Sequence, residues 1–448
     1  MRTEFSIEQL ADPRLSQAND ILRNCVHCGF CTATCPTYVE LGNELDSPRG
    51  RIYLIKDMLE NDKPASAEVV THIDRCLSCL ACMTTCPSGV DYMHLVDQAR
   101  VHIEETYDRP VADRLIRNVL AAVLPYPGRF RLALAGAFFG KPLAPLLQLM
   151  GGPFRRMGAM LKLAPYTFAG RAKEARTGNL FPASLPRTGR VALLTGCAQP
   201  VLDPGINAAA IRLLNRLGIE VVLPDGEGCC GALVHHMGRE AAALEFARAN
   251  VDAWMCEIDG DGLDAILITT SGCGVTIKDY GHLLAGDPAY AQKATRVAAL
   301  ARDISEYLAA IDLPEPVKSP GLTVAYHSAC SLQHGQKIVL QPKMLLEKAG
   351  FAVRDVPEGH LCCGSAGTYN IMQSQIATRL RARKVANIES LKPDLIAAGN
   401  IGCMTQIGTG TGLPIVHTIE LLDWAWGGPR PEALNGVAAP QERLQAAE

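Results

Sequence analysis

Short apolar runs alternate with longer amphipathic stretches in the second half of this 448-residue chain. Runs of strand length are found at residues 190–196, 265–270, 322–328 and 394–399. Apolar residues recur at helical spacing over residues 206–217, 240–256 and 376–391. Short strands that alternate with helices favour βαβ units around a parallel sheet. We therefore predict α/β structure from about residue 189 onward.

Cysteines mark this half as an internal repeat. The two matching sets are Cys197, Cys229, Cys230 and Cys273, and Cys330, Cys362, Cys363 and Cys403. Corresponding positions are 133 residues apart for the first three and 130 for the last. Because sites in parallel sheets lie at strand ends, we predict two pseudo-symmetric α/β Cys-Cys-Gly repeats with four converging thiols in each. An iron–sulfur cluster, a zinc ion and redox-active thiols are all compatible with such a site.

The first 90 residues carry two cysteine runs of the form C-x2-C-x2-C-x3-C-P. This spacing is typical of [4Fe–4S] ferredoxins, in which the fourth cysteine of each run ligates the other cluster. The predicted ligand sets are Cys25, Cys28, Cys31 and Cys86 for one cluster, and Cys76, Cys79, Cys82 and Cys35 for the second. Zinc fits these runs poorly, because zinc sites use separated C-x2-C pairs.

The stretch between the two runs is long, and residues 48–60 show helical patterning. Ser47 is the expected N-cap and Pro48 the expected first helical residue. Compact ferredoxins join their motifs by a short β-rich connection, so this stretch favours a helical dicluster ferredoxin domain. Arg49 and Arg51, near the start of the helix, are predicted to be surface charges.

Residues 109–188 are rich in Leu, Ala, Pro and Gly, and prolines interrupt their helical pattern. Asp113 is the only acid between residues 111 and 165. The basic residues there are Arg114, Arg117, Arg129, Arg131, Lys141, Arg155, Arg156 and Lys162. We predict a helical connector that packs on the folded parts, or docks to a partner subunit or an anionic membrane surface. No run reaches the roughly 18 apolar residues of a spanning helix, so none is predicted, and residues 171–189 are predicted to be a linker.

The composition limits the function classes. The net charge is −3 and there are 17 cysteines. A chain without a basic field is not expected to hold nucleic acid. The first 20 residues lack the apolar run of a secretion signal, and cysteines that stay reduced in the cytosol act as metal ligands or catalysts. We therefore predict a cytoplasmic protein that binds metal.

Other residues receive less specific predictions. Cys256 lies outside both sets and is predicted to be a buried apolar residue. Gly226 to Gly231 matches G-x-G-x-x-G, but the second repeat keeps only Cys-Cys-Gly, so nucleotide binding is not predicted there. Taken singly, the histidines of this half are predicted to be core or surface residues rather than ligands, whereas together they could carry protons or complete a site: His235, His236, His327, His334 and His360.

These patterns define five segments. The predicted segments are a dicluster ferredoxin-like domain (1–108), a helical basic connector (109–188), a first repeat (189–318), a second repeat (319–428) and a tail (429–448).

The order of two ferredoxin-type runs and two Cys-Cys-Gly repeats resembles the family of glycolate oxidase iron–sulfur subunits, and also heterodisulfide reductase subunits. The segments that carry the resemblance are 25–38, 48–56, 196–200, 271–274 and 360–369. The resemblance implies two [4Fe–4S] clusters and a complex with two flavin-bearing subunits, whose FAD oxidises glycolate to glyoxylate. The chain would then pass electrons toward a quinone-linked or membrane acceptor, from the inner face of the cell membrane, and would supply no catalytic residue itself.

Two alternatives remain at this point. Heterodisulfide reductases end each repeat with C-x2-C, whereas this chain has Thr276 and Gln406 at the final positions. That departure weakens the first alternative, a disulfide or thiol reductase. The second is the equivalent subunit of a lactate or glycerol 3-phosphate dehydrogenase.

Overall fold

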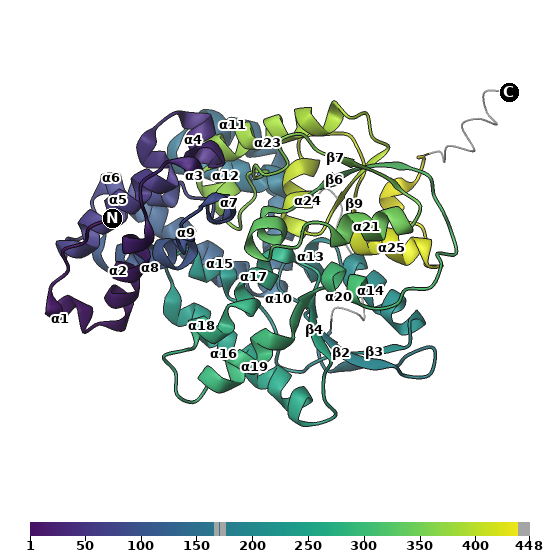
Figure 1. Cartoon of the computed structure of the whole chain (residues 1–448). Helices are drawn as coiled ribbons and strands as arrows, with labels where there is room; N and C mark the ends of the chain where they lie inside the picture. Colours follow the sequence, from purple (N-terminus) through teal and green to yellow (C-terminus); the bar gives the residue numbers. More distant parts are fainter. Residues whose placement is uncertain (165–169, 171–175, 438–448) are drawn as a thin grey trace.

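The computed structural model describes residues 1–164, 170 and 176–437. Helices enclose the two cysteine runs at the N-terminal end, drawn in purple in Figure 1. These helices are α1 (Ile7–Leu10), α2 (Pro13–Asn24), α3 (Phe30–Ala33), α4 (Pro36–Leu41), η1 (Glu44–Asp46), α5 (Pro48–Glu60), α6 (Ala67–Asp74), α7 (Ala81–Thr85) and α8 (Tyr92–Thr106). No strand forms in residues 1–108, all of which are described, so the predicted helical character of this domain is confirmed.

Helix α5 shows how the sequence positions the domain. The Oγ of Ser47 accepts a hydrogen bond from the Gly50 backbone N–H at 3.0 Å, and Pro48 is the first helical residue. This N-cap confirms the predicted start, because Ser supplies an acceptor and Pro needs no partner for a missing N–H. Ile52 and Ile55 are buried in the core of the domain, which holds the helix against the cysteine runs.

The connector is helical, and its breaks follow its prolines, as predicted. Its elements are α9 (Val111–Val123), α10 (Pro127–Gly140), η2 (Lys141–Leu143), α11 (Ala144–Leu149) and α12 (Gly152–Leu163). Helix α10 packs on α13 (Gln199–Leu202) of the first repeat, and α12 packs on α22 (Tyr369–Met372) of the second. The connector therefore touches both repeats.

The connector contains one long apolar stretch. The 23-residue stretch Pro127–Leu149 is long and apolar enough to cross a membrane, although only 11% of its most apolar window is buried. The sequence prediction considered only uninterrupted apolar runs. The mean hydropathy of this stretch stays high although it contains Arg129, Arg131 and Lys141. The stretch is divided by η2, and α11 folds back against α12.

The predicted linker also contributes structure. Residues 179–181 form β1 (Asn179–Phe181), which pairs antiparallel with β3 (Ile219–Leu223). Residues 171–175 of the linker and residues 438–448 of the predicted tail lie outside the described residues.

Each repeat builds its own sheet. The first contains β2 (Gly189–Leu193), α14 (Gly205–Arg216), β3, α15 (Ala232–His235), α16 (Glu240–Asp259), β4 (Ala265–Ile268), α17 (Ser271–Lys278), α18 (Tyr280–Leu283), α19 (Ala291–Leu300), β5 (Ala301–Asp303) and α20 (Ile304–Ala310). The second contains β6 (Thr323–His327), η4 (Ser331–Gly335), α21 (Gln341–Lys348), β7 (Ala352–Asp355), α22, α23 (Ser374–Glu389), β8 (Leu395–Ala398), α24 (Ile401–Gly408), β9 (Ile415–His417), α25 (Thr418–Ala425) and η5 (Glu432–Leu434).

The strand orders show that the repeats are equivalent. The sheets run β1-β3-β2-β4-β5 and β7-β6-β8-β9, and every pair except β1 with β3 is parallel. Removing β1 leaves the same order in both. The predicted fold class, a helical domain followed by two α/β repeats, is therefore confirmed. The exact segment boundaries stay predictions.

The two repeats share one core. Helix α14 of the first packs on α25 of the second, and α20 of the first packs on α21 of the second. Because α14 corresponds to α21 and α20 to α25, each contact mirrors the other, as at a two-fold interface. Buried leucines such as Leu214 and Leu422 fill the space between the sheets. The cysteine loops are thereby fixed relative to each other.

Candidate metal centres

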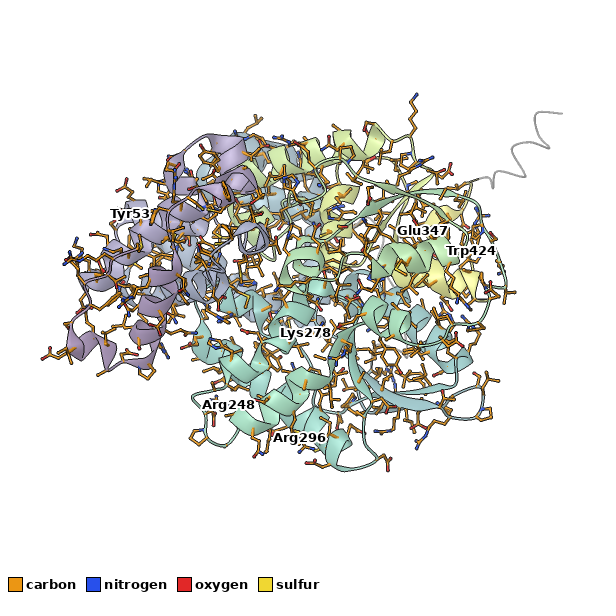
Figure 2. All side chains as sticks on the ribbon, in the orientation of Figure 1. Tyr53, Arg248, Lys278, Arg296, Glu347 and Trp424 are labelled. Atoms are coloured by element: carbon orange, nitrogen blue, oxygen red, sulfur yellow. The ribbon has the colours of Figure 1, made fainter. Side chains whose placement is uncertain are left out.

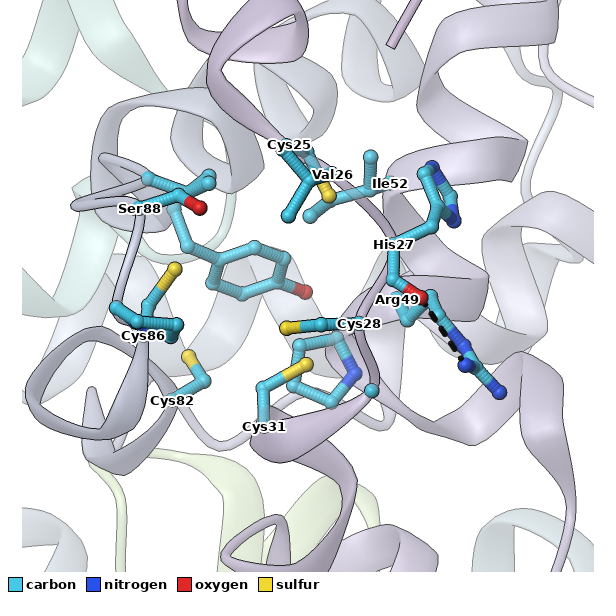
Figure 3. A pocket seen from close by; sticks show the side chains of 15 residues that line it. Cys25, Val26, His27, Cys28, Cys31, Arg49, Ile52, Cys82, Cys86 and Ser88 are labelled. Atoms are coloured by element: carbon cyan, nitrogen blue, oxygen red, sulfur yellow. Dashed lines mark hydrogen bonds between the residues drawn. The ribbon is translucent and has the colours of Figure 1, made fainter.

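The first cavity lies between the two cysteine runs and reaches solvent at Cys28, which is exposed. Cys25, Cys28 and Cys31 line one side, and Cys86, at the end of α7, faces them. Figure 3 shows these side chains around one common space. The structure thus brings together the first predicted ligand set, although cluster binding by these thiols stays a prediction.

The second cavity is lined by buried thiols. Its four cysteines, Cys35, Cys76, Cys79 and Cys82, are all buried. They belong to the second predicted ligand set, so the fourth cysteine of each run does lie opposite the other run. Cys82 lines both cavities, which places the two candidate centres next to each other.

The two runs share one backbone conformation. The third and fifth residues of each run have positive φ: 56° at His27 and 83° at Gly29, and 48° at Ser78 and 62° at Leu80. Gly29 and Leu80 then occupy the N-cap positions of α3 and α7. Glycine adopts this region freely, whereas a left-handed leucine costs roughly 1–2 kcal/mol. The packing of the run compensates for that cost at Leu80.

Arg51 corrects a prediction, because it is buried rather than a surface charge; its exposed fraction is 1%. Its guanidinium donates to the backbone oxygen of His72 at 2.7 Å and to the Oγ1 of Thr37 at 2.9 Å, and lies 3.8 Å from the Sγ of Cys35. The guanidinium thus places a positive charge beside one of the predicted cluster ligands. The helical period could have shown this, since Arg51 shares a face with Ile55, four residues later.

Arg49 is different and partly exposed. It pairs with Glu44 at 2.7 Å and donates to the backbone oxygen of His27 at 3.4 Å, drawn as the dashed line in Figure 3. Its guanidinium therefore braces the rim of the first cavity.

Three of the thiols that line these cavities hold their protons more tightly than a free cysteine does. Burial raises the pKa of Cys31 to about 11 and the pKa of Cys79 and Cys82 well above their usual range. Thiolates gathered in a buried site are stable only with a cation, and metal binding releases their protons. A dense set of buried thiols beside Arg51 fits an iron–sulfur cluster, which is held by thiolates.

In the first repeat the four predicted thiols also converge. Cys197 is hydrogen-bonded to Cys229, and Cys230 to Cys273. Beside them, the buried carboxyl of Glu227 accepts hydrogen bonds from the backbone N–H of Thr195 at 2.7 Å and from Nε1 of Trp254 at 3.2 Å. Burial raises the pKa of Glu227 to about 7.

The second repeat repeats this arrangement. The Sγ atoms of Cys330 and Cys362 are 3.7 Å apart, and Cys363 is hydrogen-bonded to Cys403. The structure adds His327: one ring nitrogen of this residue and the Sγ atoms of Cys363 and Cys403 all lie within 4.8 Å of one another. Burial lowers the pKa of His327 to about 3, so its imidazole is neutral. Sequence reasoning treated His327 as a core or surface residue, and its place three residues before Cys330 was the available signal.

An apolar cluster joins the second ferredoxin-type cavity to the second repeat. It contains Cys79 and Leu77 from the cysteine run, and Cys362 and Ile376 from the repeat, with Cys330 packed against it. The thiols of the first repeat instead pack in a cluster made of that repeat alone, which includes Cys230.

Cys256 corrects another prediction, since it is exposed rather than buried. The buried face of α16 carries Ala247, Val251 and Trp254. Cys256 follows Trp254 by two residues, which places it on the opposite side of the helix.

Comparisons with known proteins agree with these sites. A family model described as "4Fe-4S dicluster domain" matches residues 21–90, and one described as "Cysteine-rich domain" matches residues 191–278 and 324–408. The chain is 42% identical to the glycolate oxidase iron–sulfur subunit of Escherichia coli (strain K12), over 95% of this chain and 99% of that protein. The chain belongs to the family of glycolate oxidase iron–sulfur subunits. The resemblance predicted from the motifs is confirmed.

Other known proteins are also similar to this chain. The probable glycolate oxidase iron–sulfur subunit of Bacillus subtilis (strain 168) is 30% identical, over 92% of this chain and 94% of its own length. Lactate utilization protein A of Geobacillus thermodenitrificans is 28% identical over 52% of this chain and 98% of its own length. A crystal structure of a hypothetical protein from Helicobacter pylori aligns with a TM-score of 0.52 at 10% identity, over 95% of this chain and 74% of that one. This last likeness concerns the fold alone.

Proposed function

We propose that this chain is the electron-transfer subunit of a glycolate oxidase. Electrons would enter from a partner flavin that oxidises glycolate to glyoxylate and would leave toward a membrane or quinone acceptor. One observation carries the proposal: thiol sites follow one another through the fold, from exposed Cys28, through Cys82, which lines both cavities, to Cys79, which shares an apolar cluster with Cys362.

The proposed division of labour assigns substrate chemistry to the partners. When bound, the two [4Fe–4S] clusters supply one-electron transfer. Glycolate loses two electrons and two protons as it becomes glyoxylate, and a flavin accepts such a pair. The residues of this chain hold the clusters, exclude water from the second one and set the charge around it through Arg51.

The rim of the first cavity is the proposed docking surface for the flavin-bearing partner. Val26, Phe30 and Tyr53 are each more than half exposed around exposed Cys28. Tyr53, labelled in Figure 2, lies with its ring centroid 4.9 Å from that of His27, which lines the cavity. Exposed apolar side chains grouped at a redox site are typical of a protein interface.

The connector is the proposed contact with the membrane. Its exposed apolar side chains include Leu132, Phe139, Leu146 and Leu149, and basic residues outnumber acids along it. An apolar face with basic neighbours binds to the surface of an anionic bilayer. We therefore place the protein in the cytoplasm, peripherally bound to the inner face of the cell membrane.

The test uses the complex of this chain with two flavin-bearing subunits. Glycolate added without oxygen should produce the EPR signals of reduced clusters, and lactate or glycerol 3-phosphate should not. Phe30→Glu should slow that reduction at unchanged iron content. Leu149→Glu, a matched change on the connector, should leave the reduction rate intact and release the complex from anionic vesicles.

Three outcomes would overturn the proposal. They are glycolate oxidation by the isolated chain, reduction by lactate in preference to glycolate, and catalytic disulfide reduction by the isolated chain. The second outcome would favour lactate oxidation, for which the relatives named lactate utilization protein A are a reason. The third would favour a thiol reductase, for which the close approach of Cys330 and Cys362 is a reason.

A further inference from the structure

The surroundings of His327 indicate a role beyond packing. It is the last residue of β6, three residues before Cys330, and its exposed fraction is 2%. One nitrogen of its ring lies within 4.8 Å of the Sγ atoms of both Cys363 and Cys403. A buried imidazole beside two thiols is a metal-ligand set.

One nitrogen of this imidazole, the Nε2 of His327, also lacks a hydrogen-bond partner among the described residues. A buried polar atom without a partner is destabilising, and such groups in native structures point to an ion or another bound group. The unpartnered nitrogen is an observation separate from the convergence of the thiols, and both indicate a metal.

The equivalent position in the first repeat is apolar. Leu194 lies at the end of the corresponding strand region and packs in the same cluster as Cys230 and Cys273. A second difference lies on the helix after each cysteine loop: the buried ammonium group of Lys384 is near Cys363 in the second repeat, whereas the buried amide of Asn250 donates to the backbone oxygen of Cys229 in the first. The first repeat therefore offers four thiols, and the second offers four thiols with an imidazole and a nearby ammonium group.

We infer that the second repeat holds an iron–sulfur centre in which His327 supplies a nitrogen ligand beside the thiolates of Cys363 and Cys403. The first repeat, with Leu194 in place of the histidine, has no such ligand. The inference rests on the proposed electron-transfer function only for the role of this centre, since the ligand set itself is independent of the substrate.

Nitrogen ligation determines what the centre can do. A neutral imidazole brings less negative charge than a thiolate, and replacement of Cys by His in [2Fe–2S] centres raises the reduction potential. Cys362 of this repeat is in the same apolar cluster as Cys79 of the second ferredoxin-type site. The second repeat is then the electron-accepting side of that contact: one electron leaves a reduced ferredoxin-type cluster, one arrives at the repeat, and no bond is made or broken.

Pulsed EPR of the anaerobically purified, reduced complex tests the ligand directly. The predicted ligands of both ferredoxin-type sites are thiolates, so a strongly coupled histidine nitrogen reports on the second repeat. We expect this coupling in the parent protein and in His334→Leu, a control in the same repeat whose ring contacts Thr84 instead of the thiols. We expect His327→Leu to lose the coupling and part of the iron, and His327→Cys to lose the coupling but keep the iron.

Iron and sulfide analysis completes the test. The parent chain should contain more iron and labile sulfide than two ferredoxin-type clusters require. Absence of nitrogen coupling in the parent, its persistence in His327→Leu, or zinc in place of the additional iron would each overturn the inference. None of these results would change the reduction of the ferredoxin-type clusters by glycolate, so failure of this inference is distinct from failure of the proposed function.

Discussion

The two cysteine-rich repeats carry the same four thiols on equivalent loops, yet their surroundings differ in kind. Leu194, Val251 and the carboxyl of Glu227 surround the first set, whereas His327 and Lys384 lie beside the second. The backbone is shared because parallel sheets of the same order place the loops identically. Side chains from the strand end and the following helix therefore give two copies of one fold different chemistry.

The repeats also meet the ferredoxin domain differently. Polar contacts join it to the first repeat, such as Arg14 with Glu240 at 2.7 Å and His94 with Asp279 at 3.1 Å. Burial lowers the pKa of His94, but the hydrogen bonds with Asp279 and Asp91 outweigh it and raise the value to about 10. The second repeat also makes polar contacts with this domain, such as Arg383 with Glu40 at 3.2 Å, but it places its thiols in an apolar cluster with Cys79 as well. Only the second repeat thus has its thiols arranged for electron exchange with the ferredoxin-type site that contains Cys79.

The largest expected difference comes from matched ligand changes. Cys363→Ser should slow delivery of electrons from glycolate to an external acceptor by more than the roughly 10–100-fold that the loss of an outer-shell partner costs. Cys230→Ser, the same change in the first repeat, should leave that rate unchanged. The measurement is acceptor reduction by the assembled complex, with iron content determined for both variants. Equal losses would remove the functional distinction between the repeats.

Lys384 should affect how firmly the second repeat holds its metal. Its ammonium group interacts with Cys363 and Cys403, and metal binding requires thiolates. Lys384→Met removes the charge at similar length and should weaken metal retention about 10–100-fold. The control is Val251→Met in the first repeat. Loss of iron during a chelator challenge measures the effect, and identical curves for Lys384→Met and the parent would contradict it.

A smaller effect should separate the repeats by pH. Asp303 and His417 cap the equivalent helices α20 and α25, and their side chains accept from Ser305 and Ile419. Burial raises the pKa of Asp303 to about 6 and lowers the pKa of His417 to about 4. Ordinary values are about 3.9 and 6.5. The contribution of Asp303 to the free energy of unfolding therefore decreases as the pH rises from 4 to 6. The contribution of His417 decreases as the pH falls from 6.5 to 4.

Each contribution should be visible as a change in the slope of the free energy of unfolding against pH. Between pH 7 and pH 5.5, Asp303 should add about 1 kcal/mol to the free energy of unfolding and His417 should remove about 1 kcal/mol. Asp303→Asn and His417→Asn keep a capping acceptor and should abolish the respective terms, so their pH slopes should diverge in opposite directions from the parent. Urea unfolding at the two pH values measures this, and parallel slopes would show that the two caps do not titrate as described.

The smallest effect concerns Cys256, which lies outside both sets of four cysteines. Because Cys256 is exposed, it should react with a maleimide in the intact protein. Cys256→Ser should change the free energy of unfolding by less than about 0.5 kcal/mol and leave the iron content unchanged. Mass spectrometry of the labelled protein checks the first expectation, and a loss of iron in the variant would contradict the second.

Much of the architecture could be predicted from local sequence. Ser47 and Pro48 mark the start of α5, and the spacing of Cys197 and Cys330 marks the two repeats, because these features depend on short stretches of chain. Arg51 and Cys256 were assigned to the wrong environments, since residue type outweighed helical phase in both predictions. The apolar stretch Pro127–Leu149 was missed because its charged residues interrupt the apolar run, although its mean hydropathy stays high.

The sequence alone determined which thiols can share a site within each run, because a few residues of chain keep them within reach of one another. Only the tertiary structure decided that Arg51 lies beside Cys35, that Cys79 meets Cys362 and that His327 lies beside Cys363 and Cys403. These pairs are separated by 16 to 283 residues. Their proximity follows from the packing of helices and sheets around shared apolar cores, which no local pattern encodes.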